Sequence, residues 1–298
     1  MGLNENVKKL IKSVADNDFE QAKAYVKVII SNEKASGNQH FCQMIRNTLD
    51  SKPTFIELPY DLKEILKMEN VSNFNENRYF LSDREREVFE QISIAKNTNQ
   101  KLSEMGIRYL NATLLYGESG TGKTTFGRYV AYKLGLPFAY LNFSHCISSY
   151  LGSTGKNISK VFDYIAKQKC VFMIDEIDAI GIKRGKEDMG EMSRIVISLM
   201  QAFDLLENDL VVIAATNRKD MIDDALLRRF SIEHEVKTLN EYETSYLIQM
   251  FLQNLNIEYK KENIEQYSKE HNKQSKIIVD ITRAIIKMIN NKEEFILE

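Results

Sequence analysis

Cysteine is scarce in this chain, which has three among 298 residues. Cys42, Cys146 and Cys170 are odd in number and far apart, so they indicate neither a disulfide framework nor a zinc site. We expect these thiols to be buried and the protein to work in a reducing compartment. The four histidines show no ligand spacing either, so each is expected to have a structural or surface role.

Long apolar runs and an excess of one charge are also missing. No run approaches the roughly 18 residues of a membrane span, and the first residues lack the apolar core of a signal peptide. The formal net charge is −2, which gives no indication of a nucleic-acid or anionic-membrane partner. We therefore expect a soluble, cytoplasmic protein with no membrane partner and without nucleic acid as its ligand.

The hydrophobic pattern divides the chain into four segments. Residues 1–60 are expected to form a short helical module, with helices over 3–14 and 18–30 and a third from Gly37. Two prolines and a polar composition then predict a linker over residues 61–80. A helix over 82–105, with Ser82 as its N-cap, opens the next segment.

Strands and helices alternate through residues 81–239, and this alternation predicts an α/β domain. Such alternation is typical of a parallel sheet with helices on both faces, and five strands are expected. A small all-helical domain is predicted for residues 240–298, with helices over 241–255, 264–271 and 277–288. The expected strands are 112–116, 138–143, 171–175, 210–216 and 232–237, and the helices between them are 124–134, 158–167 and 191–206.

The strongest motif is the phosphate-loop pattern G-x-x-x-x-G-K-[ST], which follows the predicted strand 112–116 directly. Its glycines let successive N–H groups point inward and form a nest for anionic oxygens. Lys123 supplies a charge for the β- and γ-phosphates of ATP, and the Thr124 hydroxyl suits a Mg²⁺ ligand. A glycine-rich turn is the alternative, but the strand before and the helix after favour a nucleotide site. The expected nucleotide-binding residues are Gly117, Glu118, Ser119, Gly120, Thr121, Gly122, Lys123, Thr124 and Thr125.

Two carboxylates, Asp175 and Glu176, end the apolar strand 171–175. Ligands bind at the carboxyl ends of strands in open α/β sheets. Asp175 is expected to hold Mg²⁺, and Glu176 to orient and deprotonate the attacking water. Strands often end in Asp or Glu only because such a residue caps the following helix. Here the phosphate loop upstream favours the functional interpretation, in which the two carboxylates form a Walker B element.

In combination, these motifs resemble those of the AAA-family ATPases of the AAA+ superfamily, from about residue 101 to the end of the chain. The run IDEIDAIG at 174–181 is similar to the extended Walker B motif of that family. The strand 210–216 followed by Asn217 resembles the one that carries sensor 1, a polar residue that positions water against the γ-phosphate. The run DDALLRRF at 223–230 resembles the second region of homology. The resemblance therefore assigns Arg228 and Arg229 as arginine fingers that reach the neighbouring subunit's site.

The resemblance also implies an aromatic pore loop at Tyr150, Leu151 and Gly152, between the second predicted strand and the next helix. An aromatic, an aliphatic residue and a glycine make a small probe for extended polypeptide. A core tyrosine at a helix entry is the alternative. Residues 183–190 would form a second pore-facing loop, or simply a solvated loop.

Three features depart from the family pattern or extend it. Glu118 and Ser119 stand where the family commonly has two prolines, which changes loop rigidity but removes no ligand. The residues 274–276, Gln-Ser-Lys, stand where a sensor 2 arginine would lie in the last helix. The N-terminal residues 37–50 resemble those of bacterial single-ring AAA ATPases, some of which are encoded beside subtilisin-like proteases.

The resemblance implies Mg²⁺-dependent ATP hydrolysis by a homo-oligomer, a hexameric ring, that pulls a protein substrate through its central pore. Whether a partner protease receives that substrate is left open. A nucleic-acid motor is the first alternative, and the basic residues of the 183–190 loop give it slight support. A slowly hydrolysing assembly scaffold is the second, although the presence of Glu176, Asn217 and Arg228 argues against it.

Overall fold

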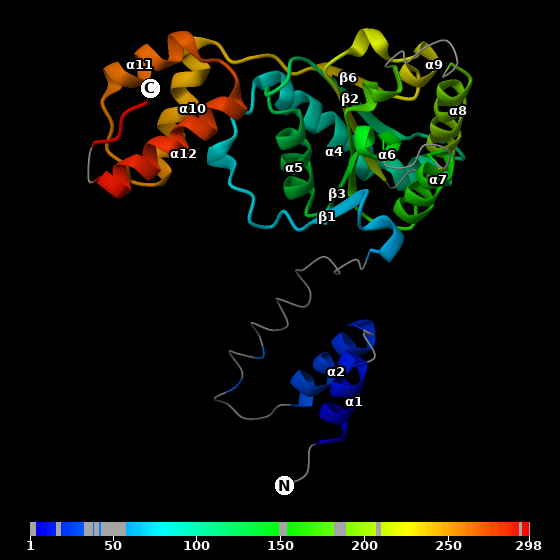
Figure 1. Ribbon diagram of the computed structural model, residues 1–298. Helices are drawn as coiled ribbons and strands as arrows, with labels where there is room; N and C mark the ends of the chain where they lie inside the picture. The colour runs from blue at the N-terminus through cyan, green and yellow to red at the C-terminus, as the bar shows by residue number, and fades with distance from the viewer. Residues whose placement is uncertain are drawn as a thin grey trace. The chain divides into compact units, whose positions relative to one another are not determined.

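The computed structural model describes residues 4–15, 19–32, 38, 42, 58–148, 154–181, 189–206, 210–291 and 294–297. The chain forms two compact units, Met1–Phe55 and Ile56–Glu298 (Figure 1). Helices α1 (Glu5–Ala15) and α2 (Phe19–Asn32) pack together in the smaller unit, where the sequence predicts two helices. The third helix predicted there lies, apart from Asn38 and Cys42, outside the described residues.

The larger unit is built around a six-stranded sheet of order β1-β3-β4-β5-β2-β6. Five strands run parallel to their neighbours, as the α/β alternation predicts, and β1 runs antiparallel to β3. This order places the end of β5 beside the end of β2, from which the phosphate loop leaves, and the end of β4 one strand further away. The strands are β1 (Leu66–Glu69), β2 (Asn111–Tyr116), β3 (Phe138–Asn142), β4 (Val171–Asp175), β5 (Val211–Thr216) and β6 (Ile232–Glu235).

Strand β1 corrects two expectations, because the sequence predicts five strands and a linker over residues 61–80. Four residues of that segment pair with β3 instead. Leu66 is fully buried in a hydrophobic core, and the Glu69 carboxylate accepts two hydrogen bonds from Arg128 at 2.7 and 3.1 Å. The strand is short and half polar, so its composition resembles that of an exposed connector.

Helices cover both faces of the sheet and give the α/β domain two hydrophobic cores. Side chains alternate along β4, so that Val171 and Met173 face one core while Phe172 and Ile174 face the other. Helices α4 (Asp83–Glu104) and α5 (Lys123–Leu134) cover the first face. The second face is covered by α7 (Thr154–Ile165) and α8 (Met189–Leu205). Shorter elements complete the domain: α6 (Phe143–Ser148), α9 (Asp224–Leu227) and the 3-10 turns η2 (Tyr60–Leu62), η3 (Glu76–Arg78), η4 (Ile177–Gly181) and η5 (Lys219–Met221).

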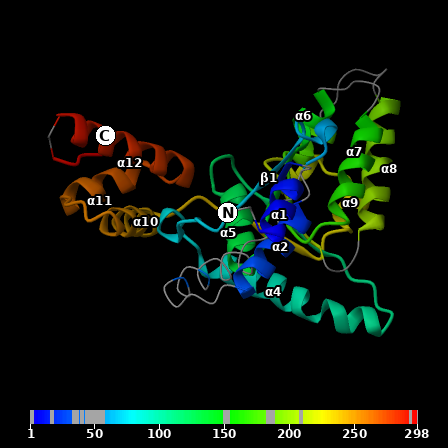
Figure 2. The ribbon, with the colours of Figure 1, turned by 90° about the horizontal axis from the view of Figure 1, so that it is seen from below.

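The C-terminal residues form the predicted helical region, which we call the lid domain. It contains α10 (Glu241–Asn254), α11 (Lys261–Glu270) and α12 (Gln274–Asn291), which group together apart from the strands (Figure 2). Its own core is formed by apolar side chains from all three helices, among them Leu247, Ile264 and Ile277. Among the described residues, no helix is both long and apolar enough to cross a membrane.

Candidate active site

The phosphate loop connects β2 to α5, as the sequence predicts, and its glycines take conformations that other residues rarely adopt. Gly117 has a φ of 143°, and Gly122, which precedes α5, has a φ of 110°. A side chain on Gly117 would also collide with the backbone carbonyl oxygen of Val236, where the chain leaves β6. Gly117 therefore serves both the turn and the close approach of a second backbone segment.

Replacement of this glycine should be costly. We expect Gly117→Ala to lower the free energy of unfolding by at least about 3 kcal/mol, because backbone strain adds to the displacement of Val236. Gly135→Ala is the matched control: Gly135 also has a positive φ, of 64°, but a Cβ there would meet nothing within 4 Å. It should cost only about 1–2 kcal/mol. Urea denaturation of both variants measures the difference, and equal losses would contradict the role of the Val236 contact.

Lys123 is buried at the start of α5, and its ammonium group lies at the centre of the site. It donates to the carbonyl oxygens of Gly117 and Glu118, both at 2.8 Å, and to Oδ1 of Asn217 at 2.7 Å. Burial lowers the pKa of Lys123, whereas the carboxylates of Asp175 and Asp178 act in the opposite direction. The contact with Asn217 joins the phosphate loop to the end of β5.

The two residues expected to hold Mg²⁺ are in direct contact. The Thr124 hydroxyl donates to Oδ2 of Asp175 at 2.8 Å, and the Tyr140 hydroxyl donates to the same oxygen at 3.3 Å. A hydroxyl beside a carboxylate gives the oxygen ligands that Mg²⁺ prefers, with the remaining positions left for phosphate oxygens and water. The part of the chain that the structure describes has no cluster of three or more His, Cys, Asp or Glu residues able to hold a metal. An ATP-bound Mg²⁺ does not need such a cluster.

Glu176 follows β4 in a left-handed conformation, with a φ of 57°, which is rare for a residue other than glycine. Its side chain is exposed, and its N–H donates to Oδ1 of Asp175 at 3.0 Å. Such backbone strain, about 1–3 kcal/mol, often occurs at functional sites. The sharp turn separates two adjacent carboxylates, since Asp175 contacts Thr124 while Glu176 extends into solvent.

Thr216 and Asp178 also support the site, although no individual role was predicted for either. Oγ1 of Thr216 donates to Oδ1 of Asp178 at 2.7 Å and accepts from the Arg218 N–H at 2.8 Å. These bonds tie the turn after β4 to the end of β5 and so position Asn217. The signal for Asp178 in the sequence was its place in the run IDEIDAIG.

The two arginines predicted as fingers differ in their surroundings. Arg229 donates to the carbonyl oxygen of Ala225 at 3.1 Å and to Oδ2 of Asp204 at 3.0 Å, so its side chain is held within its own subunit. Arg228 is exposed at the end of α9, and its side chain has no ion-pair or hydrogen-bond partner among the residues described. Of the two, Arg228 has the side chain that can reach another molecule.

Both predicted pore loops lie outside the described residues. Tyr150, Leu151 and Gly152 fall in the interval 149–153, and most of the second loop falls in 182–188. Their assignment as pore loops therefore stays a prediction.

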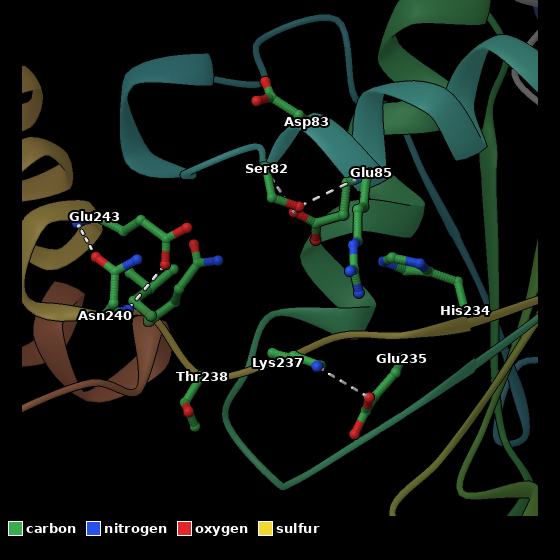
Figure 3. A pocket seen from close by; sticks show the side chains of 12 residues that line it. Ser82, Asp83, Glu85, His234, Glu235, Lys237, Thr238, Asn240 and Glu243 are labelled. Carbon is green, nitrogen blue, oxygen red and sulfur yellow. Dashed lines mark hydrogen bonds and ion pairs between the residues drawn. The ribbon is translucent and has the colours of Figure 1, made fainter.

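A separate pocket of about 430 Å³ lies between the start of α4, the exit of β6 and the start of α10 (Figure 3). Two helix N-termini border it, but each is already capped by its own chain. Glu85 accepts from the Ser82 N–H, and Glu243 accepts from the Asn240 N–H, both at 2.8 Å. These carboxylates already accept from the N–H groups at the two helix starts and place negative charge there, which disfavours the binding of an anion at these helix ends. Gln274 of the lid domain forms part of its wall.

Comparison with known proteins identifies the family. The family model described as "ATPase family associated with various cellular activities (AAA)" matches residues 113–238. An uncharacterized AAA family ATPase, y4kL, of Sinorhizobium fredii is 32% identical over 248 residues, which cover 77% of this chain and 72% of that protein. The chain belongs to the AAA family. It is therefore an ATPase, which binds ATP and hydrolyses it.

Two relatives whose names refer to proteolysis match a smaller part of this chain. The ATP-dependent zinc metalloprotease FtsH of Mycoplasma pneumoniae is 32% identical over 208 residues, which are 66% of this chain but 28% of that protein. The proteasome-activating nucleotidase of Methanococcus maripaludis is 34% identical over 155 residues, which are 50% of this chain and 38% of that protein. The AAA-family chain thus matches less than half of the length of each of these two relatives.

Proposed function

We propose that this ATPase works as a Mg²⁺-dependent ring motor that remodels protein substrates. The observation that supports the catalytic part best is the meeting of four predicted residues at the carboxyl edge of the sheet. Lys123 contacts Asn217 at 2.7 Å, and Thr124 contacts Asp175 at 2.8 Å. Asp175 and Asn217 come from the ends of β4 and β5, and Lys123 and Thr124 come from the phosphate loop that follows β2.

This geometry supports the following proposed roles for the residues. Thr124 and Asp175 would hold Mg²⁺, whose charge would neutralise the β- and γ-phosphate oxygens. The loop N–H groups of residues 117–125 and the Lys123 ammonium bind the phosphates. Glu176, exposed and separate from the Thr124 contact, deprotonates the attacking water, and Asn217 orients that water against the γ-phosphate.

A ring would follow if Arg228 acts on the neighbouring subunit. The exposed side chain of Arg228 is available to a second copy of the chain, and an arginine finger supplied in trans contributes about 10³–10⁵ to the hydrolysis rate in comparable enzymes. We therefore propose a homo-oligomer, most simply the hexamer that the family resemblance implies. A cytoplasmic location, expected from composition, stays a prediction.

A protein substrate is supported by the relatives and by the sequence between β3 and α7. The names of two relatives refer to an ATP-dependent metalloprotease and to activation of the proteasome. Tyr150, Leu151 and Gly152 have the composition of a loop that grips extended polypeptide. Stimulation of the ATPase by unfolded protein, and not by single- or double-stranded DNA, would support this function. Stimulation by DNA alone would favour the nucleic-acid motor instead, and a partner protease would have to be sought by pull-down.

A variant of the pore loop tests the protein substrate directly. Tyr150→Ala should keep basal ATPase activity within about threefold of wild type and abolish its stimulation by unfolded protein, because the ring face supplies the grip. Tyr150→Phe is the matched control and should retain most of the stimulation. If Tyr150 is a core residue instead, truncation should cost about 3–5 kcal/mol and lower the Tm sharply. ATPase assays and thermal melts of both variants distinguish these outcomes.

A further inference from the structure

Three consecutive residues at the start of α12, 273–275, connect the lid domain to the α/β domain. The central residue, Gln274, is 5% exposed. Its Oε1 accepts from the Phe80 N–H at 3.1 Å, and its Nε2 donates to the Phe80 carbonyl oxygen at 3.2 Å. Phe80 lies just before α4 in the α/β domain. A buried carboxamide with both polar atoms paired is costly to displace, so this contact fixes the position of the lid against that segment.

The next residue contacts the phosphate loop itself. The Ser275 N–H donates to the Gly120 carbonyl oxygen at 3.1 Å. The carbonyl of Gly120 and the N–H of Thr121 belong to one planar trans peptide, so they point in opposite directions. The lid domain therefore fixes the Thr121 N–H on the side of the loop that faces away from Ser275. Without this bond, the peptide between the two residues could rotate, because Gly120 has a φ of 82° that only glycine adopts freely.

The residue before Gln274 neutralises a charge that is unusual in a phosphate loop. Nζ of Lys273 lies 3.1 Å from Oε2 of Glu118, and both side chains are partly or largely exposed. A carboxylate on the loop disfavours the approach of nucleotide phosphates, since like charges repel. Lys273 offsets this repulsion only while the lid domain is in place.

These contacts move as part of the lid domain. The Leu239 N–H donates to the Asn272 carbonyl oxygen at 2.9 Å, and the Thr244 hydroxyl donates to the His271 carbonyl oxygen at 3.2 Å. The residues just before Lys273 are thereby held to the entry and first turn of α10. Any rotation of the lid domain about the connection after β6 consequently displaces Gln274 and Ser275 from their partners.

We propose that residues 273–275, with their partners Phe80, Glu118 and Gly120, form a clasp that prepares the phosphate loop for nucleotide only while the lid domain is docked. Gln274 is its positioning residue, because its two hydrogen bonds hold the lid while Ser275 orients the loop peptide and Lys273 offsets Glu118. A nucleotide that binds only the docked form shifts the lid toward that form in return. The proposal rests on the proposed function, in which the phosphate loop is the nucleotide site.

Gln274→Met tests the clasp, because it keeps the side-chain size and removes both hydrogen bonds. If this variant lowers the fraction of molecules with a docked lid domain to about a tenth, its Kd for ADP and for ATP should rise about tenfold in calorimetry. Its kcat at saturating ATP should stay within about threefold of the wild-type value. The Phe80 amide should exchange hydrogen faster, and ADP should restore part of its protection. Gln249→Met is the matched control: Gln249 donates to Ser245 at 2.9 Å within α10, so its loss should leave both Kd and Phe80 exchange unchanged.

The ion pair between Lys273 and Glu118 gives a second test. Both side chains are partly or largely exposed, so their replacement should leave the protein folded. Lys273→Ala should raise the Kd for ATP about threefold to fivefold at low salt, and Glu118→Gln in the same chain should restore most of the affinity. Lys276→Ala, which changes another lysine in the first turn of α12, should have little effect. The clasp would be overturned if Gln274→Met had an unchanged Kd for nucleotide although its Phe80 amide exchanged faster. It would also be overturned if the Kd of Gln249→Met rose as much as that of Gln274→Met. Undiminished ATP binding in Lys123→Ala would instead refute the phosphate loop as the nucleotide site.

Discussion

Glu176→Gln should bind ATP as tightly as wild type and hydrolyse it about 10²–10⁴ times more slowly. The loss is that of a general base, since the amide has the shape of the carboxylate but cannot accept the proton of the attacking water. Binding should survive because Thr124 contacts Asp175 and Lys123 contacts Asn217, and neither pair involves the Glu176 side chain. Calorimetry with ATP and single-turnover hydrolysis measure the two properties separately.

Asp175→Asn provides the contrast, because it changes the neighbouring carboxylate that would hold Mg²⁺. This variant should weaken the Mg²⁺-dependent part of ATP affinity as well as the rate, whereas Glu176→Gln should alter the rate alone. With ATP trapped, Glu176→Gln should also populate the assembled ring more than wild type, because in the proposed ring a bound γ-phosphate would engage the neighbour's arginine. An equal loss of affinity in both variants would refute the division of roles, and monomers by light scattering at saturating ATP would count against a shared site.

The sequence predicted the strands around the phosphate loop well, because their signals are local. Strand β4 has the bounds that its apolar run indicates, Val171–Asp175, and the phosphate loop lies between a strand and a helix as expected. A parallel sheet then brings the carboxyl ends of neighbouring strands together, so Asp175 and Asn217 reach the loop without any further information.

The missed features depend on contacts between residues far apart in the chain. Strand β1 has only four residues, and the burial of Leu66 becomes clear only when β3 is beside it. The clasp joins Gln274 to the backbone of Phe80, 194 residues away, and a backbone N–H leaves no trace in the sequence. The different surroundings of the two adjacent arginines were equally hidden, because Asp204 lies on another helix.

The different surroundings of Arg228 and Arg229 predict unequal effects when each is replaced by alanine. Arg228→Ala should lower kcat by about 10³–10⁵ with a much smaller change in ATP affinity, because a finger mainly contacts charge that develops in the transition state. Arg229→Ala removes a side chain already paired with Asp204, and it should cost at most about 1 kcal/mol of stability with a smaller loss of kcat. Steady-state ATPase assays and urea denaturation of both variants measure these effects.

A mixing experiment shows whether Arg228 acts on the neighbouring subunit. Lys123→Ala subunits are defective for nucleotide but keep their arginines, whereas Arg228→Ala subunits keep an intact nucleotide site. Each variant alone should be nearly inactive, and mixed rings should regain activity at interfaces where an intact Arg228 faces an intact Lys123. If co-assembly is demonstrated and no ratio restores activity, Arg228 acts within its own subunit or only supports the fold. If Arg229→Ala is the variant that needs rescue, the pairing with Asp204 must break on assembly, and Arg229 is the finger instead.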